Sequence, residues 1–323
     1  MAASDGQPDN LAFLLEHLDA GSVSEVVAAM DRLHAPHINL TDRAFFVRSY
    51  RIDFPTPDED HLINVNMMPF DILNVKDTLP KELHGYLPLI RSLPVEYVTT
   101  LRNDQGVRAV DRRPSGSWAS HVAYLTVHES WMVPGGGAQR RPGLHVERPG
   151  SVVQGGRLVC ADADRIARYR RSEITSKDLD EDSDAYMQIS WGHGYYDESF
   201  KVPVEGIWIC SNVAGTSGVY PALLERPEEV TDADGGIGAH LRDSLDRACE
   251  GKGEGKRKLL GAGEMCWITD RTPHESLPLP PDVAGELPVL RQFFRVVVGR
   301  ISHWRADRNT PNPLGTQPDA IIV

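Results

Sequence analysis

The chain has 323 residues, 41% of them hydrophobic and 25% charged, which is typical of a globular protein that can bury a sizeable core. Its 46 acidic and 34 basic residues give a formal net charge of -12, which argues against a nucleic-acid backbone as the main partner. The N-terminus lacks a secretory pattern and no apolar run reaches the roughly 18 residues that span a bilayer, so we expect a cytoplasmic protein without a membrane partner.

The N-terminal region, residues 1–44, is expected to be helical. Leucines are frequent from Leu11 to Leu18, and the following apolar segment begins where Ser22 and Glu25 fit a capping box. From about residue 45 the pattern changes to short apolar or alternating runs that are broken by Pro and Gly, which indicates strands. The strands expected are 45–54, 95–101, 120–127, 144–146, 185–191, 206–211, 264–268 and 291–301.

Two stretches interrupt this strand pattern. Residues 163–184 are densely charged, and residues 225–258 carry a helix-like segment at 239–249, so both are interpreted as insertions. Residues 306–323 are expected to form a C-terminal coil. The absence of strand–helix–strand alternation predicts one mostly β domain over 1–323, with a double-stranded β-helix (jelly-roll) core over 45–305.

The most informative motif is His145-Val146-Glu147. Two residues that are two positions apart on an extended segment point to the same side, so one segment can offer an imidazole and a carboxylate to one metal ion. A distant histidine completes the two-His, one-carboxylate set of non-haem Fe(II) oxygenases, which leaves coordination positions open. His274, after an apolar strand and a turn, is the candidate third ligand. The alternative for His-x-Glu is an ordinary pair of polar residues on a strand surface.

Other histidines are weaker candidates. His193, between glycines and near aromatic residues, is the main rival of His274 as a ligand. His128 and Glu129 are adjacent in sequence, so on a strand they point to opposite faces and cannot easily chelate one ion. A structural role or a substrate contact is expected for His128.

The segment 261–276, Gly-Ala-Gly-Glu-Met-Cys-Trp-Ile-Thr-Asp-Arg-Thr-Pro-His-Glu-Ser, resembles the second conserved motif of the cupin superfamily. His-x-Glu, a distant His and then Arg291-Gln-Phe-Phe-Arg295 resemble the Fe(II)/2-oxoglutarate-dependent oxygenases of that superfamily, at motif level over roughly residues 120–305. The resemblance implies that an arginine on the strand after His274 binds the distal carboxylate of 2-oxoglutarate. Arg291 is favoured slightly over Arg295, and both lie farther from His274 than is usual in that family.

The sequence therefore predicts a mononuclear oxygenase in which His145, Glu147 and His274 bind Fe(II), and Arg291 or Arg295 binds 2-oxoglutarate. Such an enzyme uses O2 to oxidise an unactivated C–H bond of a small-molecule substrate, by hydroxylation, desaturation or cyclisation. Two alternatives stay open. One is a cupin-type metalloenzyme that does not use 2-oxoglutarate, and the other is a metal-free jelly-roll binding protein.

Overall fold

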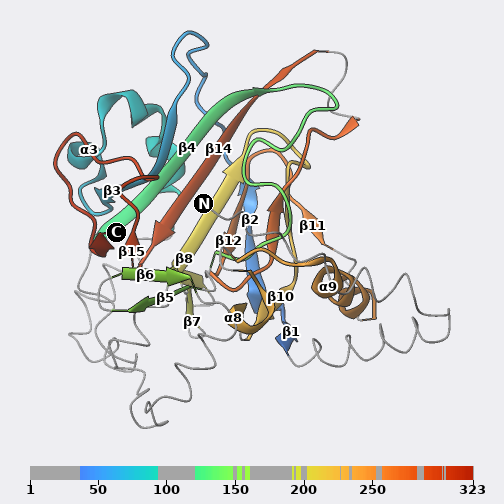
Figure 1. The fold of residues 1–323 in the computed structure, drawn as a ribbon. Coiled ribbons are helices and arrows are strands. Elements are labelled where there is room, and N and C mark those ends of the chain that lie inside the picture. The colour runs from blue at the N-terminus through green and yellow to red at the C-terminus, as the bar shows by residue number, and fades with distance from the viewer. Residues whose placement is uncertain are drawn as a thin grey trace, which may run out of the picture.

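A computed structural model describes most of the chain from residue 37 onward (Figure 1). The described residues are 37–93, 121–147, 151–154, 157–160, 191–192, 194–197, 202–225, 227–232, 235–251, 257–281, 287–299, 301 and 303–322. The expected helical stretch 9–34, the expected strand 95–101 and the charged insertion 163–184 lie outside them. Within the described residues, no helix has both the length and the apolar character needed to cross a membrane.

The structure is mostly β, as the sequence predicted, and its largest unit is a seven-stranded antiparallel sheet. The strands pair in the order β2–β12–β8–β14–β4–β3, and β7 pairs with β8 outside that path. Their bounds are Phe45–Arg51 (β2), Asn64–Asp71 (β3), Val122–Met132 (β4), Tyr195–Asp197 (β7), Val202–Ser211 (β8), Glu264–Ile268 (β12) and Val289–Val298 (β14).

In the part of the chain that the structure describes, four smaller sheets accompany this large sheet. The one that matters for the site has three strands in the order β11–β9–β13, and the others are the pairs β1–β10, β15–β16 and β5–β6. Their bounds are Ile38–Leu40 (β1), Ser151–Gln154 (β5), Arg157–Cys160 (β6), Ser217–Val219 (β9), Ala222–Leu224 (β10), Lys258–Leu259 (β11), His274–Ser276 (β13), His303–Trp304 (β15) and Ile321–Ile322 (β16).

Both ends of the described chain differ from the expectation. The region expected to be helical up to residue 44 contains strand β1 and the short 3₁₀ helix η2 (Asp42–Ala44). Strand β1 forms because Ile38 and Leu40 pack against a buried apolar cluster while its backbone pairs with β10. The C-terminal segment, expected to be coil, contains β16, whose backbone pairs in parallel with β15.

Strand β14 lies at the centre of the large sheet and separates two environments. It pairs along nearly its whole length with β4 and over its second half with β8, so its side chains alternate between two enclosed faces. Phe294, Val296 and Val298 point into a core that short helices complete. Arg291 and Arg295 have the opposite parity and are buried on the other face. This alternation places two guanidinium groups on one side of a buried strand.

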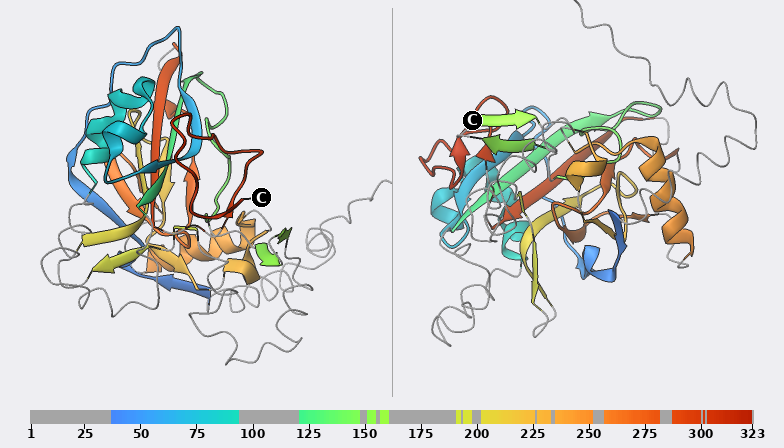
Figure 2. Two further views of the ribbon diagram at one scale, coloured as in Figure 1. Left: turned by 90° about the vertical axis from the view of Figure 1, so that its left-hand side faces the viewer. Right: turned by 60° about the horizontal axis from the view of Figure 1, so that its bottom comes forward.

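Short helices cover the apolar face of the large sheet. They are α3 (Val75–Thr78), η3 (Lys81–Tyr86) and α4 (Leu87–Arg91), and Figure 2 shows them in teal against one face. The buried carboxylate of Glu129 on β4 accepts hydrogen bonds from the Tyr86 hydroxyl (2.6 Å) and the Gln292 side-chain amide (2.9 Å). These hydrogen bonds offset the cost of burying the Glu129 carboxylate. Each large apolar side chain that is buried between the helices and the sheet contributes about 1.5–3 kcal/mol to the free energy of unfolding.

A second helical unit follows β10. It consists of α8 (Pro227–Val230) and α9 (Ala239–Gly251), which agrees with the helix expected at 239–249. Leu241 and Leu245 of α9 lie on its buried side and pack against Leu144 and Val146. The helix thereby supports the segment that carries the His-x-Glu motif.

Candidate metal centre

The His-x-Glu motif lies on an extended segment that runs beside strand β13. The backbone of His145 exchanges two hydrogen bonds with that of His274, at 3.0 and 2.9 Å, as in an antiparallel bridge. Leu144 and Val146 point into the apolar cluster under α9. His145 and Glu147, which have the other parity, line a pocket. The side chains of this segment therefore alternate between the apolar cluster and the pocket, as the sequence predicted.

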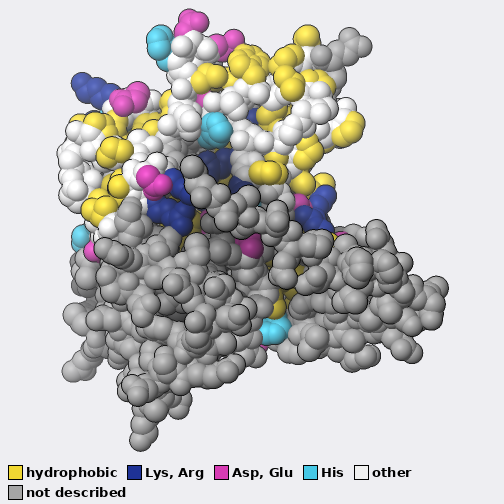
Figure 3. Space-filling view, viewed as in Figure 1, with side chains coloured by type: hydrophobic (Ala, Val, Ile, Leu, Met, Phe, Trp, Pro, Cys, Tyr) yellow, Lys and Arg dark blue, Asp and Glu magenta, His cyan; other side chains and the backbone are white. Residues whose placement is uncertain are grey.

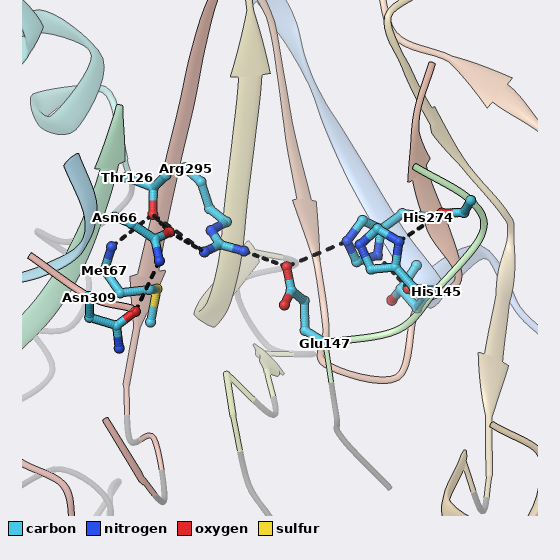
Figure 4. Close-up of polar contacts among 10 residues, drawn as sticks. Asn66, Met67, Thr126, His145, Glu147, His274, Arg295 and Asn309 are labelled. Carbon is cyan, nitrogen blue, oxygen red and sulfur yellow. Dashed lines mark hydrogen bonds and ion pairs between the residues drawn. The ribbon is translucent and has the colours of Figure 1, made fainter. Parts of the chain in front are cut away.

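The structure brings the three expected ligands together. One ligand atom from each of His145, Glu147 and His274 lies within 4.8 Å of the others, so this buried group could bind a metal ion. The two imidazole rings are 4.5 Å apart between centroids, and Nε2 of His274 is 3.6 Å from a carboxylate oxygen of Glu147. Figure 4 shows the carboxylate and both rings pointing toward one another.

Each histidine is oriented by a backbone carbonyl. Nδ1 of His145 lies 2.8 Å from the carbonyl oxygen of Gly143, and Nδ1 of His274 lies 2.9 Å from that of Thr272. Because a carbonyl oxygen can only accept, both Nδ1 atoms carry the proton and donate it. In a neutral ring Nε2 then holds the lone pair, and this is the tautomer that binds metals. This donor set of two imidazole nitrogens and one carboxylate fits a divalent transition metal.

The charge states of the ligands also suit a cation. Burial, together with the neighbouring His274, lowers the pKa of His145 to about 4 and so keeps that ring neutral. Burial alone raises the pKa of Glu147, but Arg295 and then His274 outweigh it and hold that pKa well below its usual value. The site thus offers a neutral imidazole and an ionised carboxylate without having to lose a proton from either.

A cavity of about 310 Å³ opens beside the three ligands. It lies between the large sheet and the β11–β9–β13 sheet, because both contribute to its wall. The lining residues are Asn66, Arg140, Arg141, His145, Glu147, Trp191, Ile209, Ser217, His274, Glu275, Ser276, Phe293, Arg295, Arg305, Arg308 and Asn309. In Figure 3, Lys and Arg side chains gather near the middle of this view, above the grey atoms. The cavity is large enough for small organic molecules only.

Arg295, one of the two arginines expected to bind 2-oxoglutarate, is placed beside a ligand. Its guanidinium forms an ion pair with the Glu147 carboxylate. It also donates to the side-chain oxygens of Thr126 (3.3 Å) and Asn66 (3.4 Å) (Figure 4). One oxygen of Glu147 is thus already held, which restrains how that carboxylate can turn toward a metal.

Arg291, the other candidate, lies behind the cavity wall and is fully buried. It donates to the hydroxyls of Ser211 and Ser217, both at 3.1 Å, and to the side-chain oxygen of Gln139 at 2.8 Å. Its hydrogen-bond partners among the described residues are all neutral. Burial, followed by repulsion from Arg140, lowers the pKa of Arg291 to about 9, which means that its positive charge is poorly compensated.

Arg140 is a functional candidate that the sequence argument missed. Its guanidinium lies over the ring of Phe293, 5.1 Å from the centroid, and Arg291 lies 5.2 Å from the same centroid. Burial, followed by repulsion from Arg295, lowers the pKa of Arg140 to about 10. The only signal in the sequence is the pair Arg140-Arg141 just before the Gly-Leu-His segment, and that pair does not reveal which arginine enters a pocket.

The other candidates are placed as follows. His193 lies outside the described residues, so its rank as a rival ligand is unchanged. His128 is on β4 and does not line the cavity, and burial, followed by Arg140 and Arg291, lowers its pKa. Trp191 lines the cavity, and the Arg295 guanidinium lies 5.5 Å from the centroid of its ring.

The chain matches no protein-family model, no curated protein and no solved structure. Its function is therefore inferred from the geometry of the site itself.

Proposed function

We propose that this protein is a mononuclear non-haem Fe(II) oxygenase that uses 2-oxoglutarate and O2 to oxidise a C–H bond of a small molecule. The observation that carries the proposal is the buried group of His145, Glu147 and His274 at the wall of a small cavity. Two imidazoles and one carboxylate on one side of an ion leave positions for a co-substrate and for oxygen. Bound Fe(II) would supply the oxidising power, together with 2-oxoglutarate and O2.

We also propose that the mostly β fold is a double-stranded β-helix. In such a fold two facing antiparallel sheets enclose the site and several strands contribute to it. Here His274 comes from β13 of the smaller sheet, while Arg295 comes from β14 of the large sheet. Residues of both sheets line the cavity beside the ligands, which supports this proposal.

The placement of the arginines supports binding of a dicarboxylate. Arg291 and Arg140 are two guanidinium groups around one phenyl ring, and no carboxylate of the described residues forms an ion pair with either. A buried positive pair of this kind is stabilised by an anion, and guanidinium groups bind carboxylates in a two-pronged geometry. Because Arg295 already has Glu147 as its counter-ion, we assign the distal carboxylate of 2-oxoglutarate to the pair of Arg140, which lines the cavity, and Arg291, which lies behind it.

The other side chains of the site orient the ligands and exclude water. Arg295 holds one oxygen of Glu147, and two backbone carbonyls hold the proton on Nδ1 of each histidine. Phe293 and Trp191 supply apolar surface at the cavity. A cavity with few water molecules protects a reactive centre from side reactions and strengthens electrostatic interactions.

The test is an anaerobic titration of Fe(II)-loaded protein with 2-oxoglutarate, in which the weak visible charge-transfer absorption of the iron chelate is measured. We expect the band in the wild type, no band in Glu147→Ala, and about tenfold weaker 2-oxoglutarate binding in Arg291→Gln, because part of the buried positive charge that attracts the dicarboxylate is lost. Arg140→Gln, at the cavity surface, is a second variant in case Arg291→Gln does not fold.

Arg91→Gln is the matched control, because Arg91 is an exposed arginine on α4. It should bind 2-oxoglutarate as the wild type does. Bound iron without the band would contradict the use of 2-oxoglutarate and favour a metalloenzyme of another kind. No bound metal at all would contradict the metal centre and leave a binding protein.

A further inference from the structure

The cavity is strongly positive although the protein as a whole is acidic. Five arginines and two glutamates line it, in a chain with a net charge of -12. Both glutamates already have counter-ions among the described residues. Glu147 pairs with Arg295, and Glu275 pairs with two further arginines that do not line the cavity, Arg242 and Arg257. Arg141 pairs with Asp232, which does not line the cavity, at 3.8 Å. Among the lining residues that the structure describes, Arg140, Arg305 and Arg308 therefore keep a positive charge that no carboxylate of the cavity balances.

Part of this charge lies on the C-terminal segment, away from Arg140 and Arg291. Arg305 and Arg308 line the cavity from a segment that Asn66 of β3 holds in place. The Asn66 side-chain amide donates to the carbonyl oxygen of Arg308 (3.1 Å) and to the side-chain oxygen of Asn309 (2.9 Å). The wall that carries both arginines is thus fixed to the large sheet.

The two arginine groups lie at different places along the cavity. Arg140 lies over Phe293, whereas Asn66 contacts the guanidinium of Arg295, two residues farther along β14. Two residues of a strand span about 6.6 Å. Figure 4 shows Asn66 and Asn309 on one side of Arg295, and Glu147 with both histidines on the other. Two positively charged regions therefore lie in the cavity wall: one contains Arg140, and the other contains Arg305 and Arg308.

Few acids compensate the C-terminal arginines. The guanidinium of Arg308 lies 3.7 Å from the carboxylate of its neighbour Asp307, and both side chains are largely exposed. No carboxylate of the described residues forms an ion pair with the half-buried Arg305. Exposed ion pairs contribute little, so an incoming anion can replace Asp307 at small cost.

From this charge distribution we infer that the substrate is a small organic anion whose carboxylate or phosphate group binds Arg305 and Arg308, which leaves its reacting carbon toward His145, Glu147 and His274. The inference rests on the proposed function, because the anion is taken to be the molecule that is oxidised. The cavity of about 310 Å³ limits that molecule to a small one. Guanidinium groups suit both oxyanions, since their N–H groups match pairs of oxygens.

The test uses inorganic phosphate and acetate as probes of the metal-free protein, at constant ionic strength and with saturating 2-oxoglutarate. Binding is followed by tryptophan fluorescence, because Trp191 lines the cavity. We expect saturable binding that is at least tenfold weaker in the double variant Arg305→Gln/Arg308→Gln. It should be retained in Arg305→Lys/Arg308→Lys and unchanged in the exposed control Arg91→Gln. Tighter binding of phosphate would indicate a phosphate ester, and tighter binding of acetate a carboxylic acid.

The iron–2-oxoglutarate band, measured on the same variants, separates the two proposals. The anionic substrate would be overturned if the wild type and the Gln double variant bound anions equally, or if the wild type showed no saturable binding. If the band were still present, the oxygenase proposal would stand. Arginine-dependent anion binding without the band would overturn the oxygenase and keep the anion site.

Discussion

At the scale of single residues, the site depends on which nitrogen of each imidazole is protonated. A backbone carbonyl accepts from Nδ1 of His145 and another from Nδ1 of His274, so Nε2 is the nitrogen of each ring that can bind a metal. In the metal-free protein His145 is buried without a charge, and burial disfavours its protonation. The unfolded chain binds a proton there more readily than the folded chain does.

This difference predicts a pH dependence of stability for the metal-free protein. The pKa of His145 is lowered to about 4 by burial and by His274, whereas an unfolded histidine has a pKa of about 6.5. The stability that comes from burying the neutral His145 ring is fully present above about pH 6.5, the pKa of this histidine in the unfolded chain. It is lost as the pH falls from about 6.5 toward the folded pKa of about 4. Between pH 7 and pH 5 we expect a loss of about 2 kcal/mol in the free energy of unfolding.

Urea unfolding in the presence of a chelator, at pH 7 and pH 5, checks this expectation. His145→Gln should lose clearly less stability over that interval than the wild type, because the variant has no proton to gain at this position. His61→Gln is the control, since the His61 side chain is 83% exposed, and it should behave as the wild type. The same loss of stability in His145→Gln as in the wild type would show that His145 does not cause the effect.

At the scale of elements, strands β8 and β12 approach each other closely at Gly206. Trp267 of β12 lies against β8 and donates from its indole nitrogen to the carbonyl oxygen of Glu205 at 2.6 Å. The next residue, Gly206, has φ of +127°, and a Cβ atom there would lie 2.3 Å from the same indole nitrogen and 2.9 Å from the carbonyl oxygen of Ile268. A side chain is thus excluded by sterics and by backbone conformation together.

Gly206→Ala should lower the free energy of unfolding by about 3 kcal/mol, because strained backbone and overpacking each cost about 1–3 kcal/mol. Urea unfolding at neutral pH measures the change. Gly137→Ala is the matched control: an alanine Cβ at Gly137 would have no atom within 4 Å, so stability should change by less than about 0.5 kcal/mol. Equal stability of both variants would contradict the close approach of β12 to β8.

At the scale of the whole molecule, the candidate centre joins segments that are far apart in the sequence. His145 and Glu147 precede the strands β8 and β9, and His274 follows them. The period-two spacing was sufficient to predict that His145 and Glu147 point to one side, because side-chain alternation is a local property. The mostly β character was predictable for the same reason. His274 was predicted from its place after an apolar strand and a turn, and the structure groups the three residues.

What the sequence could not predict depends on tertiary contacts. Arg140 stands beside Arg141 without a motif, and only the position of Phe293 shows which of them packs on an aromatic ring. Arg305 and Arg308 lie next to or within the segment that was expected to be coil. Hydrogen bonds from Asn66, which is distant in sequence, hold this segment at the cavity. Strand β1 was missed because three residues are too short for a periodic pattern.

The most direct test of the account is a titration of the metal-free protein with Mn(II), in which the electron paramagnetic resonance signal of the free ion is measured. We predict one ion per chain for the wild type, and affinity lowered about 100-fold or more in Glu147→Gln and in His274→Ala, because each removes a ligand of the same ion. His128→Gln, a histidine outside the group, should bind as the wild type does. No binding by the wild type, or equal binding by all the variants, would contradict a metal centre at these three residues.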